Sequence, residues 1–293
     1  LSHWMSEKYL CPWVTAMQSM LPAGLHLTGK LPQSSVRYRL YSTALLSQVK
    51  GSKRSLVRDY LLDHDGTLLS QVLADTGVKD EIIQTLVKIG AVKKVGETVW
   101  HDMPATDMFL NQRELTALQQ QAMTEILSSW QQDGKPVLLH GVTGSGKTEI
   151  YLRLLQHFVS QGKQGIFLVP EIALTPQMVD YVKTRIGVPI AVLHSGLTMA
   201  ERREAWQGIA QGIYQVVIGA RSAVFAPVPN LGIIIVDEEH ESSYKQEQTP
   251  RFHGRDVARK RCELQSGLLL LGSATPSLES YYQAEQKNYH LVQ

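Results

Sequence analysis

The eight residues from Gly141 to Thr148 constrain the fold of this chain more than any other feature. They read Gly-Val-Thr-Gly-Ser-Gly-Lys-Thr, a glycine followed by four residues and then Gly-Lys-Thr. An apolar run at residues 137–140 precedes them, and a helical pattern at residues 149–155 follows. A strand, a glycine-rich loop and a helix in this order are typical of a phosphate-binding P-loop. A chance glycine-rich turn is the alternative, and the flanking pattern argues against it.

The chemistry expected of this loop is binding of a nucleotide polyphosphate. Backbone N–H groups and the helix N-terminus favour anions. Lys147 is expected to reach the β- and γ-phosphates, and the Thr148 hydroxyl is expected to hold Mg²⁺. The other loop residues expected to contact ATP are Gly141, Thr143, Gly144, Ser145 and Gly146.

Length and composition set broad limits. The 293 residues suggest about two domains. The net charge of +2 is too small to indicate a nucleic-acid partner, which must be argued from local patches. Cys11 and Cys262 form no CxxC pair, so we expect reduced thiols and a cytoplasmic protein. No apolar run approaches the ~18 residues of a membrane span. The chain begins at Leu1, and we expect a piece of a longer protein.

Strand and helix patterns alternate from residue 106 to residue 293. Buried strands separated by helices predict a parallel sheet with helices on both faces. The candidate strands are residues 137–140, 166–169, 190–193, 215–218, 233–236 and 268–271.

Residues 35–103 show a different pattern. Three helices are predicted, at residues 55–62, 68–77 and 80–89, followed by two short strands around a turn at Gly96. This order is typical of a winged-helix domain. DNA contact is one interpretation, and a spacer or protein-docking role is the other. A phosphate-facing surface is favoured by the basic residues Arg37, Arg39, Lys50, Lys53, Arg54 and Arg58. The third helix carries mixed charge, so base-specific reading is not expected.

The second strong motif is Asp237-Glu238-Glu239-His240, directly after an apolar strand. The carboxyl ends of parallel strands are where α/β sheets bind ligands. Asp237 is expected to hold Mg²⁺ through water, and Glu238 to orient or deprotonate the attacking water. An acidic loop that caps a strand is the alternative, and the upstream P-loop weakens it.

A third motif, Gly-Ser-Ala-Thr-Pro-Ser at residues 272–277, follows another strand. Without the other two motifs, these small hydroxyl residues would be interpreted as a turn. With the two motifs above it resembles the Ser-Ala-Thr motif of superfamily 2 helicases, which links the ATP state to nucleic-acid binding. The resemblance implies coupling roles for Ser273 and Thr275, and a contact between His240 and this element.

Residues 116–293 as a whole resemble the first motor lobe of the PriA family of replication-restart DNA helicases, known as primosomal protein N′. The matching stretches are residues 141–151, 169–177, 193–197, 218–225 and 237–246. The resemblance implies a RecA-like lobe of a 3′-to-5′ DNA helicase that uses ATP and Mg²⁺. It also implies forked and single-stranded DNA, the primosome and single-stranded-DNA-binding proteins as partners, and a monomer.

The resemblance also implies a domain order. Residues 1–34 would be the tail of a 3′-DNA-end-binding domain, residues 35–103 the winged helix and residues 104–293 the first lobe. The family's paired zinc-binding cysteines are absent from this sequence. The second lobe, which supplies an arginine finger, is absent too, so the chain alone is not expected to be catalytically competent.

Further site residues follow from the resemblance. Gln119 matches a glutamine that reads the adenine edge, although by itself it would read as a surface residue. Arg221 lies in an element that lines the path of single-stranded DNA, and its charge suits a phosphate. That path also includes Pro170, Thr175, Gln177, His194, Ser195 and Gly219.

Residues 242–255 mix aromatic and basic side chains. Aromatic rings can stack on bases while cations follow the backbone. The stretch resembles an aromatic-rich loop that senses DNA and triggers ATP hydrolysis, whereas a solvated loop is the alternative. The residues expected to contact DNA are Tyr244, Lys245, Arg251 and Phe252.

Two other functions fit the motifs less well. One is a double-stranded DNA translocase of superfamily 2. The other is a winged-helix DNA-binding protein that merely senses ATP. Glu238 argues against the second, because a sensor needs no residue that activates water.

Overall fold

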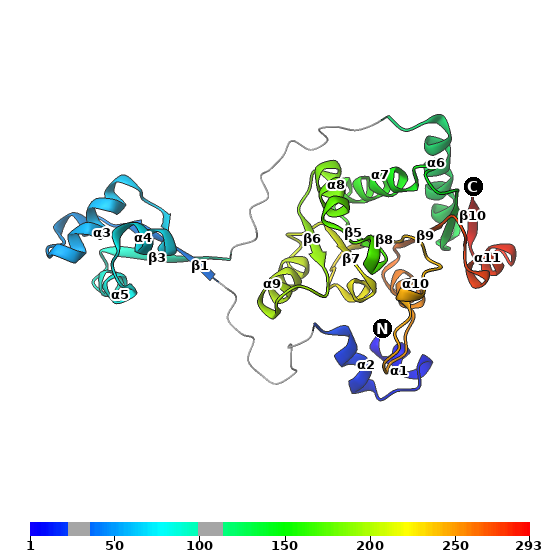
Figure 1. Cartoon of the computed structure of the whole chain (residues 1–293), viewed down its shortest axis with the longest axis horizontal. Coiled ribbons are helices and arrows are strands. Elements are labelled where there is room, and N and C mark those ends of the chain that lie inside the picture. The colour runs from blue at the N-terminus through cyan, green and yellow to red at the C-terminus, as the bar shows by residue number, and fades with distance from the viewer. Residues whose placement is uncertain (23–35, 99–113) are drawn as a thin grey trace. The chain divides into compact units, whose positions relative to one another are not determined.

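The computed structural model describes residues 1–22, 36–98 and 114–293. The chain divides into two compact units (Figure 1). The large unit contains Leu1–Thr28 and Met103–Gln293, and the small unit contains Gly29–Asp102.

The large unit is built on a seven-stranded sheet with the order β10-β4-β9-β8-β5-β7-β6, and every pairing in it is parallel. The strands are β4 (Val137–His140), β5 (Gln164–Leu168), β6 (Ile190–Leu193), β7 (Val216–Gly219), β8 (Leu231–Val236), β9 (Leu268–Ser273) and β10 (His290–Val292). The six predicted strands are confirmed to within about two residues. The short edge strand β10 was not predicted.

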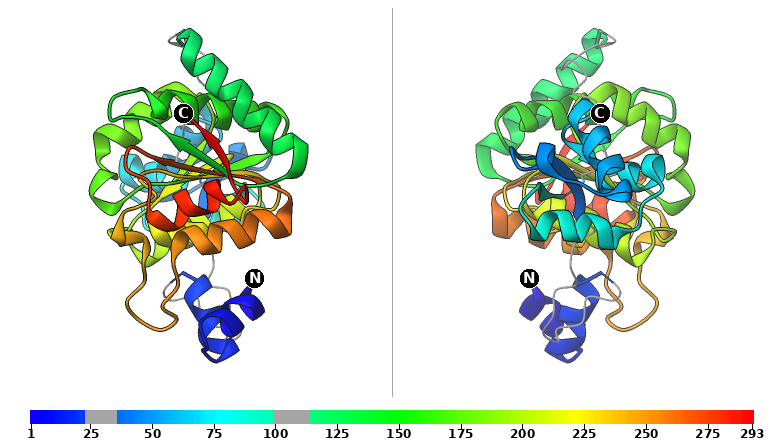
Figure 2. Two further views of the ribbon diagram at one scale, coloured as in Figure 1. Left: turned by 90° about the vertical axis from the view of Figure 1, so that its right-hand side faces the viewer. Right: turned by 90° about the vertical axis from the view of Figure 1, so that its left-hand side faces the viewer.

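Helices cover both faces of this sheet, as predicted. They are α6 (Ala117–Asp133), α7 (Lys147–Ser160), α8 (Pro176–Ile186), α9 (Met199–Ala210), α10 (Gly254–Gln265) and α11 (Leu278–Glu285). Figure 2 shows α7 and α8 on one face, and α10 and α11 on the other. The core forms because the strands are apolar on both faces, and Leu154 and Phe158 of α7 belong to the same buried cluster as Phe167 and Ile235.

Two short helices, α1 (Ser2–Lys8) and α2 (Trp13–Met20), belong to the large unit. His3 stacks on Trp13, with ring centroids 4.5 Å apart. Lys8 Nζ lies 3.1 Å from Asp256 Oδ2 on α10, and the amide of His253 donates to the Tyr9 hydroxyl at 3.4 Å. The helices therefore contact the segment that follows β8 (Figure 2).

The small unit packs three helices on an antiparallel sheet with the order β2-β1-β3. The elements are β1 (Val36–Ser42), α3 (Ser52–Asp63), β2 (Thr67–Leu68), α4 (Leu69–Thr76), α5 (Asp80–Lys88) and β3 (Val92–Thr98). Its core includes Leu40, Val57, Leu61, Ile83 and Leu86. The three predicted helices are present.

The hairpin predicted around Gly96 is wrong within the described residues. β3 runs straight through Gly96, which pairs with Tyr38 of β1. The partner strand lies more than fifty residues earlier in the chain, and local turn residues carry no information about such a partner. Residues 99 and 100 of the predicted hairpin lie outside the described residues, as do the side chains of Arg37 and Arg39.

No helix in the described parts of the chain has the length and apolar character needed to cross a membrane.

Candidate nucleotide-binding and coupling site

The P-loop connects β4 to α7, as the sequence predicts. Gly144 and Gly146 have φ of +79° and +85°, a left-handed conformation that strongly favours glycine. The Lys147 ammonium is held inside the loop, because Nζ donates to the carbonyls of Gly141 (2.7 Å) and Val142 (3.3 Å). Residues 142–145 are exposed. The loop thus combines the exposed residues 142–145 with the buried side chain of Lys147.

Gln119 reaches the P-loop from the first turn of α6. Its side chain forms a capping box with Thr116, in which Oε1 accepts from the Thr116 amide at 3.0 Å. Its Nε2 donates to the Ser145 carbonyl at 3.2 Å. A Cβ on Gly146 would lie 2.2 Å from Nε2, so the glycine also provides space. The structure brings Gln119 to the loop, and its adenine contact remains a prediction.

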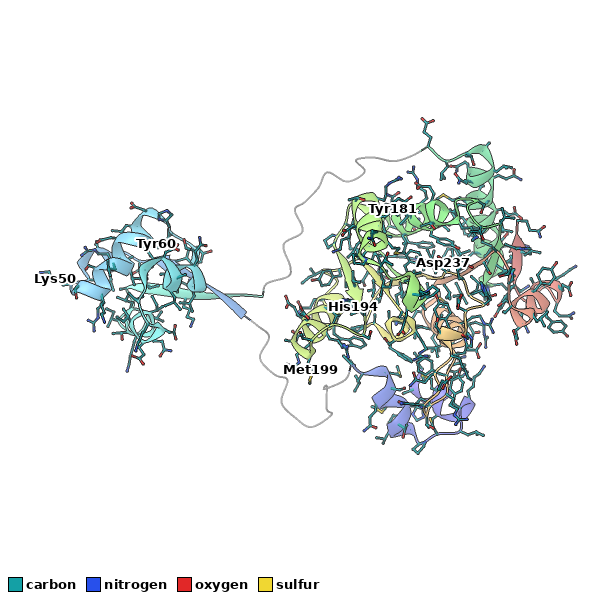
Figure 3. All side chains as sticks on the ribbon, in the orientation of Figure 1. Lys50, Tyr60, Tyr181, His194, Met199 and Asp237 are labelled. Carbon is teal, nitrogen blue, oxygen red and sulfur yellow. The ribbon has the colours of Figure 1, made fainter. Side chains whose placement is uncertain are left out.

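Asp237 lies at the carboxyl end of β8, labelled in Figure 3. Its Oδ1 accepts from the Tyr151 hydroxyl (3.1 Å) and from the Glu238 amide (3.0 Å). Burial raises the pKa of Asp237, and the nearby Glu238 charge raises it further. A nearby cation would therefore stabilise the ionised carboxylate.

The residues predicted to hold Mg²⁺ fit a magnesium ion chemically. Thr148 follows Lys147 at the start of α7, and Asp237 is joined to the same helix through Tyr151. A hydroxyl and a carboxylate are hard oxygen donors, and Mg²⁺ commonly takes one or two protein ligands together with phosphates. Within the described residues, no group of three or more His, Cys, Asp or Glu side chains could hold a metal ion.

Glu238 has a strained backbone. Its φ is +43°, in the left-handed region that few residues other than glycine adopt. Its side chain is one-third exposed, and Oε2 lies 3.6 Å from Nδ1 of His240. Such strain clusters at functional sites. The geometry is consistent with the predicted role of Glu238 toward water, which remains a prediction.

Ser273 joins three motifs. Its hydroxyl lies 2.8 Å from Nδ1 of His240 and accepts from the amide of Thr275 at 3.0 Å. Its carbonyl accepts from the Gly141 amide at 3.2 Å. The contact between His240 and the Ser-Ala-Thr element, expected from the resemblance, is present in the structure. Hydrogen bonds of Ser273 therefore connect the P-loop, the acidic motif and the Ser-Ala-Thr motif in one network.

Glu239 anchors a buried network that the sequence did not reveal. Its side chain is fully buried and accepts from Arg255 Nη1 (2.6 Å), the Ser277 amide (2.7 Å) and the Ser280 hydroxyl (2.8 Å). Burial alone would raise the pKa of Glu239, but these hydrogen bonds outweigh it and hold the pKa below its ordinary value. From sequence, a glutamate after a strand is expected to be exposed to solvent. Only the hydrogen bonds seen in the structure show that Glu239 is buried and holds this network together.

Tyr244 and Phe252 are expected from the sequence to stack on DNA bases, but both rings are buried in this structure. Tyr244 is fully buried, and its hydroxyl donates to the Asp237 carbonyl at 2.7 Å. Phe252 is 2 % exposed and packs edge-on against Phe225, with centroids 5.1 Å apart. The rings fill the space beneath their own loop, which composition cannot predict.

The cations expected to contact DNA make different contacts in the structure. Lys245 and Arg251 are exposed, with Lys245 Nζ donating to the Arg251 carbonyl at 2.8 Å. Arg221 instead donates from Nη1 to the carbonyls of Ser243 (3.0 Å) and Lys245 (2.5 Å). Arg221 therefore holds the loop in place, and its contact with a DNA phosphate remains a prediction. Lys245 and Arg251 remain predicted phosphate contacts.

Comparisons with known proteins place this geometry in a family. The family model described as DEAD/DEAH box helicase matches residues 116–284. The replication restart protein PriA of Bacillus subtilis is 37% identical over 364 aligned residues, covering 100% of this chain and 45% of that protein. The protein of the same name from Chlamydia muridarum is 35% identical over 309 residues, covering 99% of this chain and 40% of that protein.

Among solved structures, RecG bound to a three-way DNA junction covers 74% of this chain and 26% of its own, with 22% identity and a TM-score of 0.45. The chain spans less than half the length of the two curated relatives named above. The chain belongs to the DEAD/DEAH box helicase family, and its resemblance to the PriA replication restart proteins is confirmed from end to end.

Proposed function

We propose that this chain is the nucleotide-binding motor lobe, with adjoining DNA-binding parts, of an ATP-dependent 3′-to-5′ DNA helicase that restarts stalled replication forks. The main support for the proposal is the hydrogen-bond network around Ser273, which connects the three motifs. A protein that only bound ATP would have no need to join its phosphate loop to a second motif that responds to DNA. The similarity to replication restart proteins favours this function over a double-stranded DNA translocase or an ATP sensor.

ATP binding follows from the geometry of the P-loop. Lys147 exchanges the carbonyls of Gly141 and Val142 for phosphate oxygens, which are stronger partners for an ammonium ion. Thr148 and Asp237 would hold Mg²⁺, which neutralises charge on the phosphates when bound.

Hydrolysis would then use the acidic motif. Glu238 orients the attacking water and accepts its proton. The 2.8 Å contact between His240 and Ser273 would couple changes at the nucleotide site to the Ser-Ala-Thr motif.

DNA contact is proposed at two places, each within one unit. In the large unit, Lys245 and Arg251 offer exposed cations on the aromatic-rich loop. In the small unit, three helices on a small antiparallel sheet support a winged helix at residues 35–103. Lys50, Lys53 and Arg54 are exposed there, and Figure 3 shows Lys50 at the surface. Each cation that meets a phosphate adds to a salt-dependent affinity.

The remaining assignments are proposed from the resemblance. Residues 1–34 belong to a 3′-DNA-end-binding domain and residues 104–293 to the first motor lobe. The protein works as a monomer in the cytoplasm, with the primosome and single-stranded-DNA-binding proteins as partners.

The proposed function is tested by ATP hydrolysis of the whole protein with and without forked DNA. We expect DNA to stimulate hydrolysis, because Tyr244 of the aromatic-rich loop donates a hydrogen bond to the Asp237 carbonyl in the site. The matched control is this chain alone, which is expected to hydrolyse ATP negligibly because the arginine finger is assigned to a second lobe. Hydrolysis unaffected by DNA, or robust turnover by this chain alone, would contradict the proposal.

A further inference from the structure

Tyr151 occupies a place where the three motifs meet, yet neither the motifs nor the resemblance gave it a role. It lies four residues after Lys147, one helical turn further along α7, and is fully buried. Its ring packs against Phe167 of β5, with centroids 5.7 Å apart and an interplanar angle of 66°. Packing on a strand in the core fixes the ring, and therefore fixes where its hydroxyl points.

That hydroxyl points at Asp237. It donates to Oδ1 at 3.1 Å, and the Glu238 amide donates to the same oxygen at 3.0 Å. Among the described residues, Oδ2 has no hydrogen-bond partner. Two donors on one carboxylate oxygen hold the group in a single orientation and leave the other oxygen for a ligand.

Gly272 supplies the space that this arrangement needs. A Cβ at Gly272 would lie 1.7 Å from the Tyr151 hydroxyl oxygen and 2.7 Å from Cζ. The φ of Gly272 is not in the left-handed region, so the glycine is required for space and not for backbone conformation. Gly272 also accepts from the Glu239 amide at 3.1 Å, which keeps β9 beside the acidic motif.

We propose that Tyr151 is a positioning residue that orients the Asp237 carboxylate toward the Mg²⁺ of bound nucleotide, and that Gly272 admits its hydroxyl. This inference rests on the proposed function and adds a residue to it. Tyr151 and Lys147 lie on the same helix, so the residue that holds the Asp237 carboxylate and the residue expected to contact the phosphates are one helical turn apart. Residues that hydrogen-bond to a metal ligand commonly change metal affinity by about 10-fold to 100-fold when removed.

The test measures how Mg²⁺ changes nucleotide affinity. A fluorescent ATP analogue is titrated into this chain, once with Mg²⁺ and once with EDTA, for the wild type and for Tyr151→Phe. We expect the variant to lose roughly 10-fold in affinity with Mg²⁺. Its affinity in EDTA should stay within about twofold, because the loop and Lys147 are unchanged. The urea midpoint of unfolding is recorded for each variant.

A second variant approaches the same contact from the other side. Gly272→Ala keeps the tyrosine but displaces its hydroxyl, so it should lose affinity selectively with Mg²⁺ as well. The control is Tyr214→Phe, which removes a hydroxyl from another buried tyrosine, just before β7, a strand separated from β9 by β8 and β5. It should change neither affinity.

Two results would overturn the inference. One is an unchanged affinity of Tyr151→Phe in the presence of Mg²⁺. The other is an equal loss with Mg²⁺ and with EDTA together with a lower urea midpoint, which would mean that the hydroxyl only supports packing. A wild-type chain that binds the analogue in neither condition would instead overturn the proposed function, and the inference with it.

Discussion

Replacing Lys147 with alanine in the whole protein is expected to lower ATP turnover by roughly 100-fold to 1,000-fold. Lys147 is the lysine of the P-loop, and its ammonium sits at the base of the loop between two carbonyls. Alanine removes the cation that would stabilise the charge developing on the phosphates. DNA affinity should remain largely unchanged, because the proposed DNA contacts lie elsewhere. Steady-state turnover and DNA titration of the same preparation check both expectations.

The control for Lys147→Ala is Lys135→Ala. Lys135 precedes β4 at the opposite end of that strand from the P-loop, where it pairs with Asp133. We expect this variant to retain turnover. Near-wild-type turnover in Lys147→Ala would show that the loop does not hold the reacting phosphates.

Arg255→Met is expected to destabilise this chain by about 3–5 kcal/mol. Arg255 is 11 % exposed, and its partner Glu239 is fully buried. Methionine matches the aliphatic part of arginine but leaves Glu239 as a buried charge that has lost its cation. Urea unfolding gives the free energy of unfolding directly. Adding Glu239→Gln should recover part of the loss, because the uncompensated charge is then gone.

The matched control is Arg259→Met on the same helix. Arg259 pairs with Glu263 at the surface, with 33 % and 41 % of the two side chains exposed, so its loss should cost only about 0.5 kcal/mol. Equal losses for Arg255→Met and Arg259→Met would show that the Glu239 network adds no stability.

The Glu239 network also predicts an acid sensitivity. The pKa of Glu239 is lower in the folded state than in the unfolded state. Ionised Glu239 therefore adds to the free energy of unfolding above the unfolded pKa of about 4.3, and this stabilisation is lost as the pH falls through the folded pKa.

The sheet of the large unit could be predicted because its strands are continuous apolar runs, a pattern with few other interpretations. The P-loop could be predicted because Gly144 and Gly146 are needed for left-handed backbone. The contact between His240 and Ser273 came from the family resemblance and not from spacing.

Other features could not be predicted, because they depend on contacts between distant residues. The pairing of β1 with β3 joins segments over fifty residues apart. Tyr244 reads as an exposed loop aromatic, yet tertiary packing buries it under Asp237. From sequence, Tyr151 is expected to be an ordinary core residue of α7, and only its hydrogen bond to Asp237 in the structure indicates a further role.

Strand displacement by the whole protein is the direct test of whether this chain is part of an ATP-driven DNA helicase. The whole protein is given a labelled forked duplex with a 3′ or a 5′ single-stranded tail, with ATP or with a non-hydrolysable analogue. We expect displacement that requires ATP hydrolysis and proceeds 3′-to-5′ along the bound strand, and that is lost in Lys147→Ala. ATP hydrolysis stimulated by DNA without displacement on any fork would contradict the claim and would favour a translocase.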